Sequence, residues 1–175
     1  MNKLFAFILS CLSIFSAYAV DVVVQLNGGI LAQSCNISSA DLVKNINFPD
    51  LNPKDFAQVG ATSTEQEVVI KLLSCTGNVE NMSYQFSGEP DVTDLTLLKV
   101  LGKSGASLDT VATGLAIEIL NSNKQKIPLN TIQKINKTIT NSSYDFNFYL
   151  RYKSTANDVG PGDASSIVYL DFYYE

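Results

Sequence analysis

The feature that most restricts the fold of this chain is a repeated alternation of apolar and polar residues. It is clearest over residues 144–153, where every second side chain is apolar or aromatic: Tyr144, Phe146, Phe148, Leu150 and Tyr152. A period of two gives an extended strand one apolar face, whereas a helix needs apolar residues three and four apart. After residue 19, no helical period extends beyond about two turns. The chain is therefore predicted to be an all-β protein.

Other segments show the same alternation and are separated by residues typical of turns. Residues 65–75 carry apolar side chains on both faces, which predicts a strand in the centre of a sheet. Residues 45–51 contain Pro49, which cannot donate to a strand ladder, so an edge position is expected there. Residues 95–101 fit either a strand or a short helix. Further strands are expected at 82–87, at 114–120 with a hairpin turn at 121–124 into 125–129, and at 166–175, with a weak strand plus a turn at 131–141. Many short strands joined by turns favour an antiparallel sandwich.

The size and composition of the chain argue against several classes of function. Its 175 residues, 46% of them hydrophobic, are enough for one domain with a core. The formal net charge is -5 and the 12 basic residues are scattered, so no nucleic-acid partner is expected. The chain has no histidine and no nucleotide-binding, hydrolase or metal-binding motif. No enzymatic activity, cofactor or metal is therefore expected.

The first 19 residues have the pattern of a secretory signal peptide. Lys3 supplies the positive start, residues 4–15 are mostly apolar, and residues 17–19 form a cleavage site of the Ala-x-Ala type. The apolar run is too short to span a bilayer. A lipoprotein signal at Cys11 is the weaker alternative, because the residues before it fit that signal poorly. The mature chain is expected to begin at Val20 and to be exported.

Export changes the interpretation of the cysteines. Of the three cysteines, Cys11 leaves with the signal peptide, and Cys35 and Cys75 remain. An even number of cysteines in an oxidising compartment favours a disulfide over two free buried thiols. A disulfide between Cys35 and Cys75 is therefore predicted.

The mature chain is expected to begin with a strand that has no obvious partner. Over residues 20–30, alternate positions are apolar or glycine: Val22, Val24, Leu26, Gly28 and Ile30. This apolar face lies on a free N-terminal arm, and it has to be buried somewhere. Gly28 within the apolar set indicates a place where a partner approaches closely. We expect that partner to lie in another molecule.

Several of these features resemble one known family in their order and spacing. Cys35 is the sixteenth residue counted from Val20, and Cys75 closes a strand of sequence Val-Val-Ile-Lys-Leu-Leu-Ser-Cys. Tyr174 is penultimate, and Gly162 is the fourteenth residue counted from the end. Together with the signal peptide and the arm, these features resemble the pilin subunits of bacterial chaperone–usher fimbriae. The resemblance is greatest to the minor adaptor subunits of type 1 pili.

The resemblance implies an immunoglobulin-like antiparallel sandwich that lacks its final strand. A signal peptide (1–19) and an N-terminal donor-strand extension (20–33) would precede a pilin domain (34–175). The arm of one subunit would fill a groove beside the C-terminal strand of a neighbouring pilin. A periplasmic pilus chaperone would occupy that groove until the subunit reached an outer-membrane usher. The C-terminal motif implied to meet the chaperone and the groove is Gly162, Val168, Leu170, Phe172 and Tyr174. The product would be a fimbria on the cell surface.

Two other functions stay open at this stage. Within the same family, the chain would be the major subunit of the fimbrial rod instead of a minor or adaptor subunit. In a different class, it would be a secreted β-sandwich that binds carbohydrate through its 8 tyrosines, which cluster from Tyr144 onward. The commoner explanation of such tyrosines is that alternate ones belong to the core and the rest favour strands. The carbohydrate-binding alternative also leaves the N-terminal arm unexplained.

Overall fold

The computed structural model describes residues 33–103 and 110–174, within one compact unit that spans Leu31–Glu175. Its regular elements are eight strands and two short 3-10 helices, and the described residues contain no α-helix. No helix among them is long and apolar enough to cross a membrane. The prediction of an all-β fold is confirmed.

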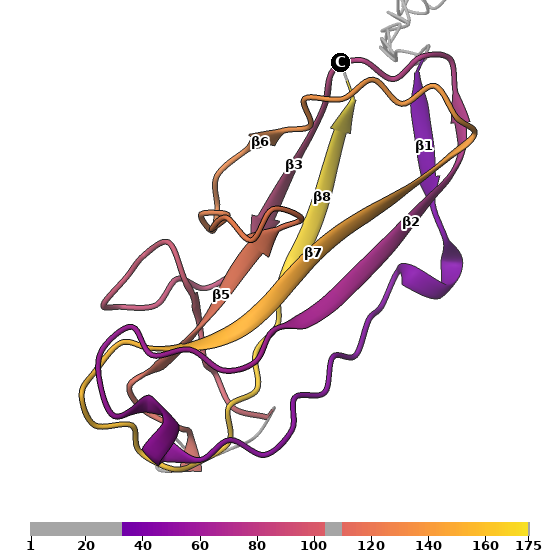
Figure 1. The fold of residues 1–175 in the computed structure, drawn as a ribbon. Helices are drawn as coiled ribbons and strands as arrows, with labels where there is room; N and C mark the ends of the chain where they lie inside the picture. The colour runs from indigo at the N-terminus through magenta and orange to yellow at the C-terminus, as the bar shows by residue number, and fades with distance from the viewer. Residues whose placement is uncertain (1–32, 104–109, 175) are drawn as a thin grey trace, which may run out of the picture. The chain divides into compact units, whose positions relative to one another are not determined.

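The strands form two antiparallel sheets (Figure 1). In spatial order, the larger sheet consists of β1 (Ser34–Ile37), β2 (Gln66–Thr76), β7 (Ser143–Ser154), β5 (Leu115–Asn121) and β4 (Leu98–Lys99). The smaller sheet consists of β6 (Gln133–Lys134), β3 (Met82–Ser87) and β8 (Tyr169–Tyr174). The two longest strands, β2 and β7, are neighbours and pair from Gln66 with Leu150 to Leu73 with Ser143. They form the central ladder of the larger sheet.

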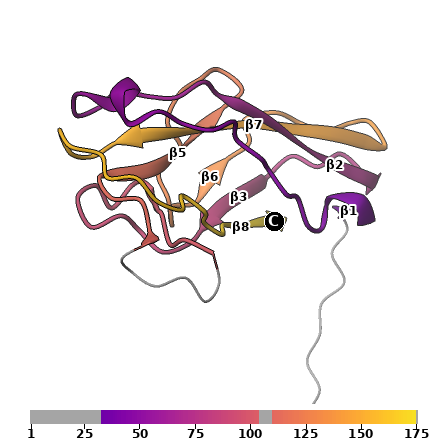
Figure 2. The same ribbon diagram turned by 90° about the horizontal axis from the view of Figure 1, so that it is seen from below.

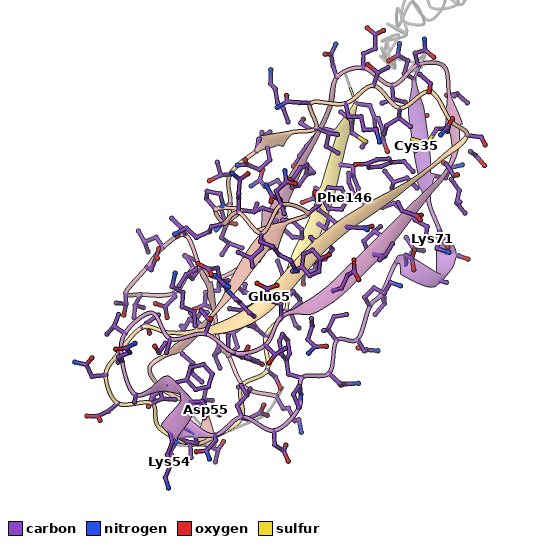
Figure 3. All side chains as sticks on the ribbon, viewed as in Figure 1. Cys35, Lys54, Asp55, Glu65, Lys71 and Phe146 are labelled. Carbon is purple, nitrogen blue, oxygen red and sulfur yellow. A yellow bond between two sulfur atoms is a disulfide. The ribbon has the colours of Figure 1, made fainter. Side chains whose placement is uncertain are left out.

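The apolar faces of the two sheets pack against each other. Figure 2 shows β7 and β2 in one layer and β3 and β8 in the other. Phe146 of β7 (Figure 3) contacts Phe172 of β8, with the ring centroids 5.2 Å apart. Phe148 of β7 lies 4.8 Å from Phe86 of β3, measured between the same points. Aromatic pairs at such distances add to the free energy gained by burying the rings. These side chains therefore hold the two layers together.

The alternation over residues 144–153 predicts both strand β7 and its buried face correctly. The buried apolar side chains of this strand are Phe146, Phe148, Leu150 and Tyr152. β2 lies between β1 and β7, as expected for a central strand. Only one of its faces is buried, however, because Leu72 is 0% exposed whereas Leu73 is 40% exposed. Apolar residues on both faces of β2 therefore do not show that other elements cover both faces in the fold.

The structure shows the conformation of two shorter segments, residues 95–101 and 121–124. Residues 95–101, which fit either a strand or a helix by sequence, contain the two-residue strand β4. The hairpin turn at 121–124 is confirmed, because the amide of Lys124 donates to the carbonyl oxygen of Asn121 at 2.9 Å. The side-chain oxygen of Asn121 also accepts hydrogen bonds from the amides of Asn123 and Gln125, at 2.9 and 3.0 Å. An asparagine suits this position because it satisfies the turn's amides.

A network of ion pairs crosses the strands of the larger sheet. Glu118 of β5 is 2% exposed, and its carboxylate lies 2.6 Å from Arg151 and 2.7 Å from Lys153, both on β7. Arg151 also lies 3.1 Å from Glu65 (Figure 3), which pairs with Lys124 at 2.6 Å. Burial by itself raises the pKa of Glu118, but the hydrogen bonds and charges of Lys153 and Arg151 outweigh burial and hold the pKa below its usual range. Glu118 is therefore a charged group shielded by two cations that are themselves about a quarter exposed.

An aspartate side chain caps the edge of β2 just beyond the end of β1. Asp41 closes the 3-10 helix η1 (Ser39–Asp41), and its carboxylate accepts a hydrogen bond from the amide of Lys71 at 2.7 Å (Figure 3). The ammonium group of Lys44 lies 2.6 Å from the same carboxylate. The hydrogen bonds from Lys44 and from the Lys71 amide lower the pKa of Asp41. Asp41 thus satisfies an amide that β1 does not reach.

Candidate functional site

The last strand, β8, is paired on one side only within the described ranges. It pairs with β3 over its whole length, from Tyr169 with Ser87 to Tyr174 with Met82. No other described strand pairs with its second edge. The side chains of β8 that face the core are only partly buried: Leu170, Phe172 and Tyr174. β8 therefore presents an open backbone edge and a half-covered apolar face.

An open groove of about 1120 Å³ starts at the beginning of this strand. Its two walls are residues 42–51 and residues 159–169, the second of which leads into β8. The floor is formed by core side chains of the larger sheet, among them Leu115, Ile117, Leu150 and Tyr152. A complete sandwich would cover such side chains with a further strand. The groove marks the place where this sandwich is incomplete.

The first wall, residues 42–51, is held by side-chain packing, since the ring centroid of Phe48 lies 4.7 Å from that of Tyr152. Its backbone makes no backbone hydrogen bond to another described residue. Leu42 and Val43 are 67% and 77% exposed, whereas Ile46 and Phe48 are partly buried against the core. Residues 45–51, expected at the edge of a sheet, belong to no strand of the described residues. The backbone of this wall is therefore not paired in either sheet within the described residues.

The second wall is held by a close contact at Gly162. A Cβ atom placed on Gly162 would lie 2.5 Å from the amide nitrogen of Ala112 and 2.6 Å from the carbonyl oxygen of Thr110. The hydroxyl of Tyr152 donates to the carbonyl oxygen of Ala164 on the same wall, at 2.5 Å. Glycine is needed at position 162 because two backbones touch there. The implied contact of Gly162 with a chaperone stays a prediction.

A disulfide lies near the far end of β8. Cys35 of β1 and Cys75 of β2 are disulfide-bonded across 40 residues of sequence, as predicted. The hydroxyl of Tyr174 lies 3.3 Å from the carbonyl oxygen of Cys35. Burial raises the pKa of Tyr174, so its hydroxyl stays protonated at neutral pH and donates this hydrogen bond.

The structure places part of the predicted site. Val168 lines the groove, and Phe172 packs against Phe146 in the core. Sequence reasoning did not assign residues 42–51 to the groove, although the alternation of Ile46 and Phe48 with asparagines was a usable signal. The predicted donor-strand residues lie outside the described residues: Val22, Val24, Leu26, Gly28 and Ile30. Within the described ranges, no group of three or more acidic or cysteine side chains is arranged to hold a metal ion.

The fold and its open edge define an incomplete immunoglobulin-like sandwich. The model of the Fimbrial protein family matches residues 24–175, so the chain belongs to that family. By this family membership it is a fimbrial subunit.

Individual relatives agree with this assignment. The chain is 30% identical over 155 residues to the fimbrial-like protein YcbU of Escherichia coli, covering 88% of this chain and 84% of YcbU. It is 28% identical over 171 residues to the major fimbrial subunit SMF-1 of Stenotrophomonas maltophilia, covering 91% of this chain and 95% of that protein. In fold it resembles the P pilus rod subunit PapA, with a TM-score of 0.63, 17% identity, and coverage of 81% of this chain and 99% of PapA.

Proposed function

We propose that this subunit polymerises by donor-strand exchange after chaperone–usher export. In this mechanism, its arm residues Val22, Val24, Leu26, Gly28 and Ile30 fill the groove of a neighbouring subunit, and its own groove receives a strand from another chain. The observation that carries the proposal is the open edge of β8 beside a groove floored by core side chains. The subunit has no catalytic role in this proposal.

The physical reason for strand exchange is the unfinished core. The floor side chains are only 6–8% exposed, so the apolar surface that an added strand would cover is mainly that of the partly buried Leu170, Phe172 and Tyr174 of β8, at about 25 cal/mol per Å². The main chain of the added strand can pair with β8 on one side and with residues 42–51 on the other. Alternate apolar side chains on the incoming strand would set its register, because a shift by one residue turns them to the wrong face.

The same exposed groove supports the proposed route through the cell. A groove that attracts strands must be occupied before assembly, since open edges promote aggregation. We assign this task to a periplasmic chaperone, which would contact the C-terminal motif Gly162, Val168, Leu170, Phe172 and Tyr174. The signal peptide (1–19) would direct the chain to the periplasm, and an outer-membrane usher would release it into the fibre.

Within the fimbria, the proposed place of the chain is that of a minor or adaptor subunit. This part of the proposal rests on the resemblance to type 1 adaptor subunits. The major rod subunit is the second candidate, and it is favoured by the likeness to SMF-1 and by the fold shared with PapA. The number of copies in purified fimbriae separates the two, because an adaptor is present at a few copies per fibre and a rod subunit in great excess.

The mechanism is tested by two matched variants in the arm. Gly28→Arg places a charge and excess volume on the apolar face, whereas Asn27→Arg places the same side chain on the polar face. We expect both variants to bind the chaperone in wild-type yield, because their own cores are unchanged. Only the Asn27→Arg variant should enter fibres. Equal incorporation of the two variants would remove the arm from the mechanism.

A further inference from the structure

The outward face of β8 carries an acidic side chain between two tyrosines. Every second residue of this strand faces the core, so the residues between them point away from it. These are Tyr169, Asp171 and Tyr173, and all three are exposed, the two tyrosines by 65% and 41%. Residues of one face follow each other at about 7 Å along a strand. The three side chains therefore form a continuous row, which we call the outer row of β8.

The carboxylate in the middle of the outer row has no cation beside it. Asp171 is the cross-strand partner of Gln85 on β3. Among the described residues, its side chain bonds only to the hydroxyl of Ser87, which donates to it over 3.4 Å. That distance is long for a hydrogen bond from a hydroxyl to a carboxylate. The carboxylate therefore keeps most of its capacity to accept hydrogen bonds and to pair with a positive charge.

The outer row has the composition of a receptor for a lysine or arginine side chain. The charge of such a side chain would pair with Asp171, and its aliphatic stem would lie against the neighbouring rings. Aromatic rings also attract a cation placed over their faces. The same combination occurs elsewhere in this chain, because the ammonium group of Lys124 lies 2.8 Å from the ring centroid of Tyr149 and 2.6 Å from Glu65.

The open edge of β8 determines where such a side chain would come from. β8 lies beside β3 (Figure 1), and within the described residues no strand pairs with its other edge. Residues directly opposite each other on paired strands point to the same face of the sheet. The exposed side chains of an incoming strand would therefore meet the outer row. A long side chain opposite Asp171 also reaches the two diagonal positions, where the tyrosines stand.

We propose that the outer row selects incoming strands that carry a lysine or arginine opposite Asp171. This inference rests on the proposed strand exchange and adds a second recognition surface to it. The groove would contact the buried side chains of the incoming strand, and the outer row would contact the exposed ones. A carboxylate on an edge strand repels strands that bring a negative charge, and edge strands use such charges to restrict pairing. Here the same charge favours a strand with a cation.

The arm of this chain lacks the cation that the outer row would bind. Residues 20–32 contain no lysine or arginine, and Asp21 lies on the polar side of their alternation. An arm from a second copy of this chain therefore forms no ion pair with Asp171, and a register that brings Asp21 opposite Asp171 is disfavoured. The preferred occupant of the groove is accordingly the arm of a different subunit.

The test measures the binding of labelled synthetic peptides to the full mature chain by fluorescence anisotropy at low ionic strength. The parent peptide has the sequence of residues 20–32 with Asp21→Asn, so that it carries no charged side chain. At each of positions 21, 23, 25, 27 and 29 in turn, one peptide carries lysine and another carries glutamate. Binding is compared for the wild type, Asp171→Lys, Asp171→Asn and the matched control Asp145→Lys. Asp145 is also an exposed aspartate on an outward strand face, but it lies on β7 in the other sheet.

At one position, the one opposite Asp171, we expect the lysine peptide to bind the wild type about three- to tenfold more tightly than the glutamate peptide. Asp171→Lys should reverse that preference and Asp171→Asn should remove most of it, whereas Asp145→Lys should leave it unchanged. Equal binding of lysine and glutamate peptides at every position overturns the inference. A preference that persists in Asp171→Lys also overturns it, because the net charge of the chain would then be the cause. Failure of every peptide to bind would refute strand exchange itself, and the inference with it.

Discussion

The hydroxyl of Tyr174 donates a hydrogen bond to the carbonyl oxygen of Cys35 over 3.3 Å, and it thereby joins the edge strand of one sheet to the edge strand of the other. Tyr174 belongs to β8 and Cys35 to β1, which is tied to β2 by the disulfide. This bond holds the two sheet edges at a set separation at the end of the sandwich where the disulfide lies.

Removing that hydroxyl should lower stability without disturbing the core. Tyr174→Phe keeps the ring and loses one partly buried hydrogen bond, so we expect the free energy of unfolding to fall by about 1 kcal/mol. Urea unfolding measures the change. Tyr169→Phe is the control, because Tyr169 is 65% exposed and its hydroxyl bonds to no described residue. Equal midpoints for the two variants would show that the bond contributes nothing.

The disulfide should be complete in the exported protein and should contribute strongly to its stability. Its loop of 40 residues implies a loss of about 4 kcal/mol in the double variant Cys35→Ser and Cys75→Ser, on the chain-entropy estimate. Mass spectrometry after alkylation without reduction should detect no modified thiol on mature wild-type protein. Uptake of two alkyl groups would contradict this expectation.

Glu118 should matter more to stability than its neighbour Glu65. Glu118→Gln leaves the charges of Arg151 and Lys153 without their buried partner, and these cations are about a quarter exposed. We expect a loss of about 2 kcal/mol, less than for a fully buried pair because water reaches the cations. Glu65→Gln, whose side chain is 26% exposed, should cost under about 1 kcal/mol. Denaturant unfolding at neutral pH measures the loss of stability in each variant and should show the larger loss for Glu118→Gln.

The contribution of Glu118 should also depend on pH in a defined direction. Its pKa is lower in the folded protein than in the unfolded chain, so the unfolded chain binds the proton first as the pH falls. Stability from this group is complete above about pH 5 and is lost as the pH falls through the lowered folded pKa. The difference in unfolding free energy between wild type and Glu118→Gln should therefore shrink between pH 7 and about pH 3. A difference that stays constant over this range would rule out the ion pair as its source.

A methyl group at Gly162 should disturb the wall that leads into β8. Gly162→Ala places its Cβ against the backbone of residues 110–112, which cannot rotate away, so a loss of about 1–3 kcal/mol is expected. Gly160→Ala is the matched control, because its Cβ meets mainly the side chain of Thr113, which can turn aside. Thermal unfolding of the two variants should place Gly162→Ala lower. The reverse order would mean that the backbone contact at Gly162 is unimportant.

The sequence alone predicts a strand and its buried face where large apolar residues occupy every second position. In β7 every second residue is large and apolar, so both the strand and its inner face were predicted. In β2 the side chains of Val69 and Leu73 look equally suited to a core, but whether anything covers them depends on the arrangement of other elements. The two-residue strand β4 is too short for any period to be recognised.

The sequence also predicts only part of the candidate site. The unpaired last strand follows from the resemblance and from the alternation of residues 166–175. The wall at residues 42–51 and the ion pairs of Glu118 depend on which distant strands become neighbours and in what register. That information is not contained in any local pattern, and the same holds for the contact between Gly162 and Ala112.

The carboxylate of Asp41 has a consequence for how such subunits can connect to one another. It occupies the amide of Lys71 at a point where β1 has already ended and the edge of β2 would otherwise be free to receive a foreign strand. Asp41 thus occupies this one amide on the edge of β2, whereas the second edge of β8 is left without a partner strand among the described residues.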